Sequence, residues 1–148
     1  MYDDILVPTD GSRAVERTLE HAFPIATAND AAVHALSVLD TRIVQAATGE
    51  TRDEITAQLE RECEAATTDV AARASENGLE TIERVERGTP AKTILEYADD
   101  HEIDLIVIGT HGKSPREKRM SMGSVSERVV DKASVPVFVV RSGDSPSR

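Results

Sequence analysis

The amino-acid sequence predicts one α/β domain built on an open, five-stranded parallel sheet with helices on both faces. Short apolar runs alternate strictly with segments of helical periodicity along the 148 residues. This order is typical of parallel strands joined by right-handed helical crossovers. Several of the runs are apolar without interruption, as expected for strands buried on both faces of a sheet.

The first half of the chain supplies two strands and two helices. Ser12 is a preferred N-cap residue for the first helix, and Pro24 predicts that this helix is kinked or ends early. Gly78 is placed to cap the second helix at its C-terminus. The predicted bounds are 5–7 and 32–39 for the strands, and 14–29 and 52–77 for the helices.

The second half supplies three strands and two helices. The third strand is more polar than the others, which favours a place near an edge of the sheet. Thr89 and Pro90 provide an N-cap followed by proline at the first helical position. The predicted bounds are 82–87, 103–108 and 135–140 for the strands, and 90–100 and 124–133 for the helices. The first and fourth strands are expected to flank the reversal of the sheet's winding, where ligands bind in such folds.

The charge balance excludes a typical nucleic-acid-binding protein. The chain carries 17 Lys and Arg residues against 27 Asp and Glu residues, a formal net charge of −10. Nucleic-acid binding needs a basic face that displaces counterions from phosphates. Only Lys92, Lys113, Lys118 and Lys132 are lysines. An acid-rich, lysine-poor composition favours an origin in a halophilic archaeon, and an ordinary acidic protein is the alternative.

We expect a cytoplasmic protein without a membrane span. The first residues have neither the basic nor the apolar region of a signal peptide, and no apolar run approaches the ~20 residues that a span requires. Cys63 is the single cysteine and cannot form an internal disulfide. Its helical spacing from Leu59 and Val70 indicates a core residue rather than a nucleophile. The domain is expected over 1–141, with a disordered tail at 142–148.

Residues 109–114 contain the Gly-Lys-Ser end of the Walker A motif but do not complete it. The motif requires a glycine where Val107 stands, and Pro115 follows where a helix should begin. A G-x-G-x-x-G dinucleotide fingerprint is also absent. The P-loop and dinucleotide-fold interpretations are therefore rejected.

What remains is Gly109 and Gly112, followed after ten residues by Gly123 and Ser124 at a predicted helix start. Glycines allow backbone amides to approach a ligand closely, and a helix N-terminus attracts phosphate. Ser124 is a candidate helix cap, phosphate ligand, or both in turn. Between the glycines lies a local charge of +3, from Lys113, Arg116, Lys118 and Arg119 against Glu117. The position of this cluster favours phosphate binding over a solvated loop paired with neighbouring acids.

Five segments together resemble the universal stress protein family, and the resemblance runs from about residue 2 to 141. These segments are residues 5–12, 88–90, 103–112, 123–129 and 135–137. The resemblance implies a Rossmann-like sheet of the adenine nucleotide alpha hydrolase type. The ATP-binding branch has the signature G-x2-G-x9-G-(S/T). This chain keeps the three glycines and the serine but has ten residues in the second gap, a change that a loop absorbs cheaply.

The resemblance also implies a binding site for ATP or AMP, with Mg²⁺ as an accompanying ion. Base and ribose would contact Pro8, Thr9, Asp10 and Val38. Ile108 and Gly109 would line the same pocket, and Gly112, Gly123, Ser124 and Val125 would hold the phosphates. Asp10 is suited to accept a hydrogen bond from a ribose hydroxyl, with a helix or turn cap as its alternative role.

Two functions stay open at this point, and an enzyme is the less favoured third. The first is a stress-response module that senses ATP or AMP and signals to regulatory partners. The second is a family member that binds no nucleotide and acts as a dimeric scaffold, which the longer loop favours. His111 lacks the partners of a catalytic base, and His21, His34 and His101 show no metal-ligand spacing. Any ATP hydrolysis is expected to be slow.

A homodimer is predicted through the last strand, residues 135–140. This strand is apolar on both faces and should lie at an edge of the open sheet. A bare apolar edge promotes aggregation unless it is covered, and Pro136 blocks only one position of it. Pairing across a two-fold axis would cover the same surface on both chains. Shielding of the strand by a helix or the tail in a monomer is the alternative.

If the protein is halophilic, its thermal midpoint should climb steeply between low salt and molar KCl. Raising the salt from 0.1 M to 1 M shortens the Debye length from about 10 Å to about 3 Å, so repulsion among the excess acids would be screened. Differential scanning calorimetry over a KCl series measures the effect. An unchanged midpoint would rule out the halophile interpretation.

Overall fold

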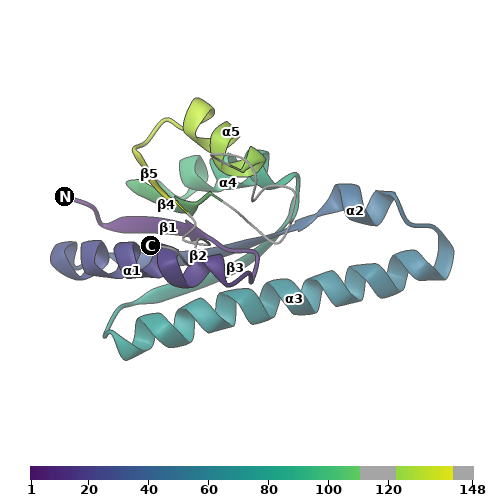
Figure 1. Cartoon of the computed structure of the whole chain (residues 1–148), viewed down its shortest axis with the longest axis horizontal. Helices are drawn as coiled ribbons and strands as arrows, with labels where there is room; N and C mark the ends of the chain where they lie inside the picture. The colour runs from purple at the N-terminus through teal and green to yellow at the C-terminus, as the bar shows by residue number, and fades with distance from the viewer. Residues whose placement is uncertain (111–122, 142–148) are drawn as a thin grey trace, which may run out of the picture.

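Five parallel strands form one sheet in the order β3-β2-β1-β4-β5, as predicted (Figure 1). The computed structural model describes residues 1–110 and 123–141. Gly112, the four predicted loop cations and the predicted tail lie outside these described residues. The strands are β1 (Asp4–Pro8), β2 (Ala32–Asp40), β3 (Thr81–Gly88), β4 (Leu105–Gly109) and β5 (Val137–Val140). The helices are α1 (Ala14–Asn29), α2 (Thr41–Gln45), α3 (Gly49–Glu76), α4 (Pro90–Asp100) and α5 (Ser124–Lys132).

Most predicted elements are confirmed with small shifts. The third and last strands lie at the two edges, and β1 and β4 are neighbours at the reversal of winding. The fourth and fifth strands begin two residues later than predicted, at Leu105 and Val137. Gly78 adopts φ +72° and donates to Ser75, while Leu79 donates to Ala74, which is a Schellman C-cap.

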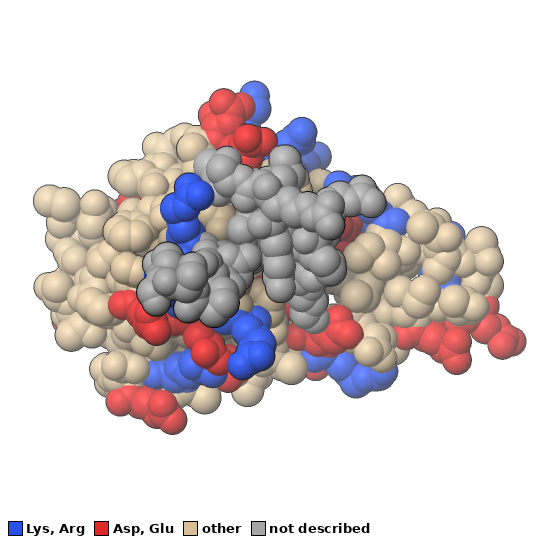
Figure 2. Space-filling view, viewed as in Figure 1, with Lys and Arg blue, Asp and Glu red and all other residues tan. Residues whose placement is uncertain are grey.

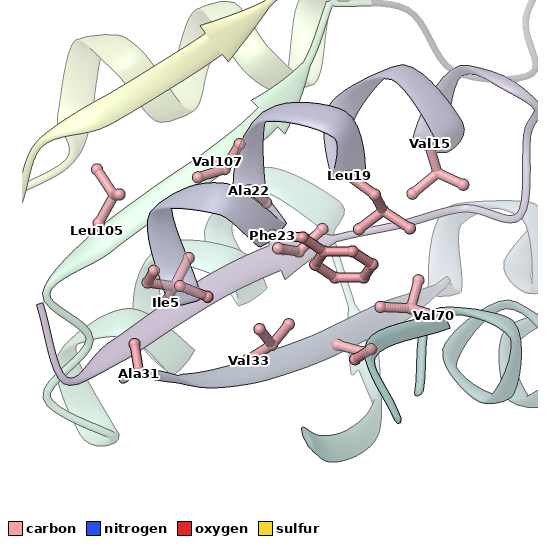
Figure 3. Packing of buried hydrophobic residues seen from close by; sticks show 14 of the residues in the cluster. Ile5, Val15, Leu19, Ala22, Phe23, Ala31, Val33, Val70, Leu105 and Val107 are labelled. Carbon is pink, nitrogen blue, oxygen red and sulfur yellow. The ribbon is translucent and has the colours of Figure 1, made fainter. Parts of the chain in front are cut away.

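Two apolar layers hold the helices to the sheet. On one face α1 and α3 cover Ile5, Val7, Val33, Leu105 and Val107. Figure 3 shows side chains of α1 directed onto these strands. On the other face α4 and α5 cover Leu6, Leu36, Ile106 and Ile108. In Figure 1 these two helix layers lie on opposite sides of the sheet.

Helix α1 has the predicted bounds, but two expectations about it are overturned, an early end at Pro24 and a cap at Ser12. The helix continues past Pro24 to Asn29. Pro24 and Glu20 are both exposed, so water can bind the Glu20 carbonyl that proline leaves without a donor. Ser12 is not the N-cap, because Arg13 occupies that position without a side-chain cap hydrogen bond. The amide of Ser12 instead donates to Asp10 Oδ1 in a turn.

The sequence analysis missed helix α2, a single short turn directly after β2. Asp40 caps it: its side chain accepts from the amide of Arg42 at 3.0 Å. The Arg42 guanidinium also binds both Asp40 oxygens, at 2.9 and 2.8 Å. This hydrogen bonding lowers the pKa of Asp40 below its usual value, so the cap is ionised at neutral pH. Asp40, a preferred N-cap residue directly after the strand, was the available signal.

A buried hydrogen-bonded network links β1, β2 and α4. Tyr97 lies 2.7 Å from His34 Nδ1, and His34 Nε2 lies 2.9 Å from Asp4. Burial raises the pKa of Tyr97, so its hydroxyl remains a donor at neutral pH. The Asp4 carboxylate can only accept, so Nε2 of His34 carries the hydrogen, and in the neutral imidazole Nδ1 then accepts from the Tyr97 hydroxyl. His101 stacks on Tyr97 at 3.8 Å, so two histidines from separate elements meet here.

We expect Tyr97→Phe to lower the free energy of unfolding by about 1–3 kcal/mol, because His34 Nδ1 stays buried without its donor. Urea denaturation followed by circular dichroism measures this loss. Tyr2→Phe is the matched control, since the Tyr2 hydroxyl makes no hydrogen bond to the described part of the chain. Equal stability of the two variants would contradict a structural role for the network.

Candidate functional site

A cavity of about 440 Å³ opens at the carboxyl ends of the strands. It lies over the exits of β1 and β4, where the winding of the sheet reverses, and extends to α2 and α3. Predicted site residues that line it are Pro8, Thr9, Asp10, Val38, Ile108, Gly109, Gly123 and Val125. The structure therefore brings residues of β1, β2, β4 and α5 to one concave surface.

The loop after β1 is held by its own backbone and side chains. The amide of Thr9 donates to the carbonyl of Leu36 at 2.8 Å, which continues the pairing with β2. Thr9 Oγ1 accepts from the amide of Gly11 at 3.2 Å. Asp10 Oδ1 accepts from the amide of Ser12 at 2.9 Å. Asp10 thus serves as a turn cap, and its carboxylate is fixed at the rim of the cavity.

Gly109 at the end of β4 is required by packing. A Cβ atom at this position would lie 2.9 Å from Thr18 Oγ1 of α1. The next residue, Thr110, is buried, and its amide donates to the carbonyl of Val140. The sequence analysis assigned Gly109 to close approach of a ligand, and in this structure the group that its missing side chain admits is α1.

The N-terminus of α5 faces the same cavity. Gly123 occupies the N-cap position with extended backbone, so Ser124 is the first helical residue and not the predicted cap. Ser126 Oγ donates to the carbonyl of Gly123 at 3.0 Å. Gly123, Val125 and Ser126 line the cavity, whereas Ser124 is not among its lining residues. The first-turn amides of a helix have no carbonyl partner within it, which creates a positive end suited to an anion.

The cavity has a second side that the sequence analysis missed. Successive side chains of β2 point to opposite faces of the sheet. Leu36 and Val38 face the α4 layer, and Ser37 and Leu39 face α1 and α3. From α3, Leu59, Glu62 and Cys63 complete what we call the α3 side of the cavity. Cys63 is buried, as predicted, but it lines the cavity and lies outside the two apolar clusters.

Charge is distributed unevenly around this cavity. Asp10, Asp40 and Glu62 bring carboxylates to its wall, and no Lys, Arg or His is among its described lining residues. The predicted cations Lys113, Arg116, Lys118 and Arg119 lie outside the residues that the structure describes. In Figure 2 acidic and basic side chains alternate along the lower border of the molecule. Among the described groups, the α5 N-terminus is therefore the positive element of the site.

The described residues contain no group of three His, Cys, Asp or Glu side chains that could hold a metal ion. His34 and His101 belong to the buried network around Tyr97 and are not among the residues that line the cavity. The rings of His21 and Phe138 meet at a tilt with their centroids 5.5 Å apart, and neither residue lines the cavity. Within residues 1–110 and 123–141, no helix is long and apolar enough to cross a bilayer.

The chain matches known proteins along most of its length. The model described as "Universal stress protein family" matches residues 1–141. Universal stress protein MJ0531 of Methanocaldococcus jannaschii is 37% identical over 142 residues, covering 95% of this chain and 83% of the relative. The solved structure of protein MJ0577 superposes with a TM-score of 0.89 at 31% identity, covering 98% of this chain and 99% of that chain.

Two further similar structures contain nucleotides. One is a universal stress protein in complex with cAMP, with a TM-score of 0.71, 25% identity and coverage of 96% and 98% of the two chains. The other is the universal stress protein of Archaeoglobus fulgidus in complex with dAMP. Its TM-score is 0.69 at 25% identity, with coverage of 94% and 98%.

Proposed function

The chain belongs to the universal stress protein family, and we propose that it is a regulatory protein that binds ATP or AMP at the carboxyl ends of β1 and β4. The observation that carries the proposal is the single cavity that joins the fixed Asp10 loop to the N-terminus of α5. An acidic acceptor near a ribose and a positive helix end near phosphate match the two polar parts of a nucleotide. Bound cAMP and dAMP in similar proteins support this ligand class.

In this proposal the phosphates bind at the first turn of α5. The amides of Gly123, Ser124 and Val125 would donate to phosphate oxygens, together with Gly112. Lys113, Arg116, Lys118 and Arg119 would add the positive charge that the described wall lacks. A Mg²⁺ ion accompanying ATP would be held mainly by phosphate oxygens and water, because the described residues offer no three-ligand cluster.

The ribose would lie beside Asp10. The bond from the Ser12 amide orients this carboxylate, and Asp10 is exposed. A ribose hydroxyl donating to an ionised carboxylate forms a charge-assisted hydrogen bond, which is about twice as strong as a neutral one. We infer regulation through nucleotide occupancy and as yet unidentified protein partners, rather than turnover of the nucleotide.

We expect Gly123→Val to abolish nucleotide binding, because the branched side chain would occupy the space of the phosphate and cover the amides. Isothermal titration with AMP and with ATP at molar KCl measures the affinity. Gly123→Ala is the matched control and should lose much less, since it adds one methyl group to an extended backbone. Thermal unfolding of both variants verifies that the fold is retained.

The same titration on the wild-type protein separates the two candidate functions. Absence of ATP and AMP binding would refute the proposed function. It would favour the alternative function, a dimeric scaffold that binds no nucleotide. The longer gap between the glycines is the sequence feature that favours this alternative. Chromatography of nucleotide released from the purified protein provides an independent check.

We also propose that the protein forms a homodimer through β5 and the residues that lead into it, 135–140. β5 pairs with β4 on one side only, and Phe138 is 39% exposed. Val130 on helix α5, which contacts β5, is also 44% exposed. Val137 and Val139 face the α4 and α5 layer and are partly buried there. Phe138 lies on the opposite face beside His21 of α1, and the part of its ring that stays exposed is the apolar surface that the dimer would cover.

Phe138→Lys should convert the dimer to a monomer, because two lysines would face each other across the two-fold axis. Light scattering at working salt measures the mass of the wild type and the variant. Val139→Lys is a less specific test, since it would also disturb the apolar layer that Val139 contacts. A monomeric wild type, or a Phe138→Lys protein that dimerises with full affinity, would contradict this interface.

A further inference from the structure

We propose that the outer edge of β3 is a second self-association surface, at which two copies of the chain pair their β3 strands antiparallel about Val85. This edge lies at the end of the sheet opposite to β5, so it is separate from the dimer surface proposed above (Figure 1). The occupant is a second copy of this chain, because the order of charges along β3 is complementary to itself.

The backbone of β3 presents hydrogen-bonding groups away from the sheet. The amide of Val33 donates to the carbonyl of Glu80, directly before β3, so this carbonyl faces β2. Backbone groups alternate in direction along a strand. Every second residue from Thr81 to Arg87 therefore directs its amide and carbonyl outward. Within residues 1–110 and 123–141 no other strand pairs with this edge, which is thus a template for a further strand.

The charges along β3 read the same in both directions with their signs exchanged. The five central residues are Glu83, Arg84, Val85, Glu86 and Arg87. When two such strands run antiparallel about Val85, Glu83 lies opposite Arg87 of the second copy. Arg84 lies opposite Glu86 of the second copy, and Val85 lies opposite itself. Two-fold symmetry repeats both charge pairs, so every charge of the segment meets an opposite one.

Other registers of the same pairing bring like charges together. A residue on the two-fold axis lies opposite itself, and like charges directly opposite each other are destabilising. An axis at Arg84 would oppose two arginines, and an axis at Glu86 would oppose two glutamates. Axes at Glu83 and Arg87 have the same fault. Charged edge strands usually prevent association, but this order of charges leaves one register open, the one about Val85.

The side chains of β3 are placed to form these pairs. Glu83 and Arg87 are exposed on the face that α3 covers, and Arg84 is exposed on the opposite face together with the half-buried Glu86. Val85 directs its backbone groups outward, so it forms a hydrogen-bonded pair on the axis. Arg84 and Glu86 then form the closer type of pair, with Cα atoms about 4.5 Å apart. All five residues lie outside the two apolar clusters, so pairing leaves the core intact.

Association through β3 should be weaker than association through β5. Exposed charge pairs stabilise only modestly, and Val85 is the one apolar residue of the segment. A dimer formed through β5 keeps its two β3 edges, since these lie at the far ends of the joined sheets. At high protein concentration such dimers would therefore associate further.

The first test reverses charges in the Phe138→Lys chain, so that β5 does not contribute to association. Sedimentation equilibrium up to about 1 mM protein should show a reversible dimer. Molar KCl is used, because it screens the long-range repulsion between net charges of −10. Arg84→Glu opposes two glutamates in each pair and should weaken the dimer at least about tenfold. Glu86→Arg should do the same by opposing two arginines.

Two combinations should restore the dimer. The double variant Arg84→Glu/Glu86→Arg exchanges both charges within one chain and keeps the complementary order. An equimolar mixture of the two single variants should form a mixed dimer, because each reversed charge then meets its opposite. Glu76→Arg is the matched control, since it makes the same change of charge at an exposed residue at the end of α3. Thermal unfolding verifies that every variant is folded.

The second test removes one backbone donor from the edge. Val85→Pro deletes an amide that points away from β2, a position at which an edge strand tolerates proline. The fold should be retained and the dimer lost. Val85→Thr keeps the amide and should dimerise as the parent does.

Absence of association up to about 1 mM overturns the assignment. It is also overturned if the charge-reversed or proline variants associate as strongly as the parent, or if the folded single variants fail to associate when mixed. None of these outcomes bears on nucleotide binding, which is measured separately by calorimetry.

Discussion

The reversal of winding between β1 and β4 is the constraint on which the rest of the structure depends. From β1 the chain first builds β2 and β3 toward one edge, and then crosses back to add β4 and β5 on the other side. Because each crossover is right-handed, building in opposite directions places the connecting helices on opposite faces. This explains why α1 and α3 share one apolar layer and α4 and α5 share the other.

The same reversal leaves the exits of β1 and β4 uncovered by a crossover. Helices from the two strands depart to opposite faces, so a gap remains above the neighbouring strand ends. The residues at this gap are small or polar, and they bond to their own backbone: Thr9 to Gly11 and Asp10 to Ser12. At Gly109 the absence of a side chain lets α1 pack closely beside the gap. The cavity is thus a consequence of topology, and its local chemistry is set by a few turn residues.

Much of this architecture could be predicted from the sequence because it depends on local periodicity. Apolar runs fixed the strands, and Gly78, Thr89 and Pro90 marked helix ends through their own backbone preferences. The misses concern contacts between distant segments or elements too short to show a period. Helix α2 spans five residues, less than two turns. The bond between His34 and Tyr97 joins residues 63 positions apart, which no local pattern reveals.

The residues of the candidate site fall into the same two groups, those placed by local sequence features and those placed by contacts between distant segments. Strand exits and the α5 start are local features, and their residues were predicted, whereas the α3 side depends on how a long helix crosses the sheet. The fully buried residues of α3 begin at Cys63, while the turn before it is only partly buried and is tied to β3 by the ion pair between Glu60 and Arg87. In Figure 1 its N-terminal half extends beyond the sheet, together with α2. Because the fully buried residues of α3 start at Cys63, the apolar layer ends there and the cavity opens beside Ser37 and Leu39. The position of Cys63 in the middle of α3 therefore marks where the core stops and the cavity begins.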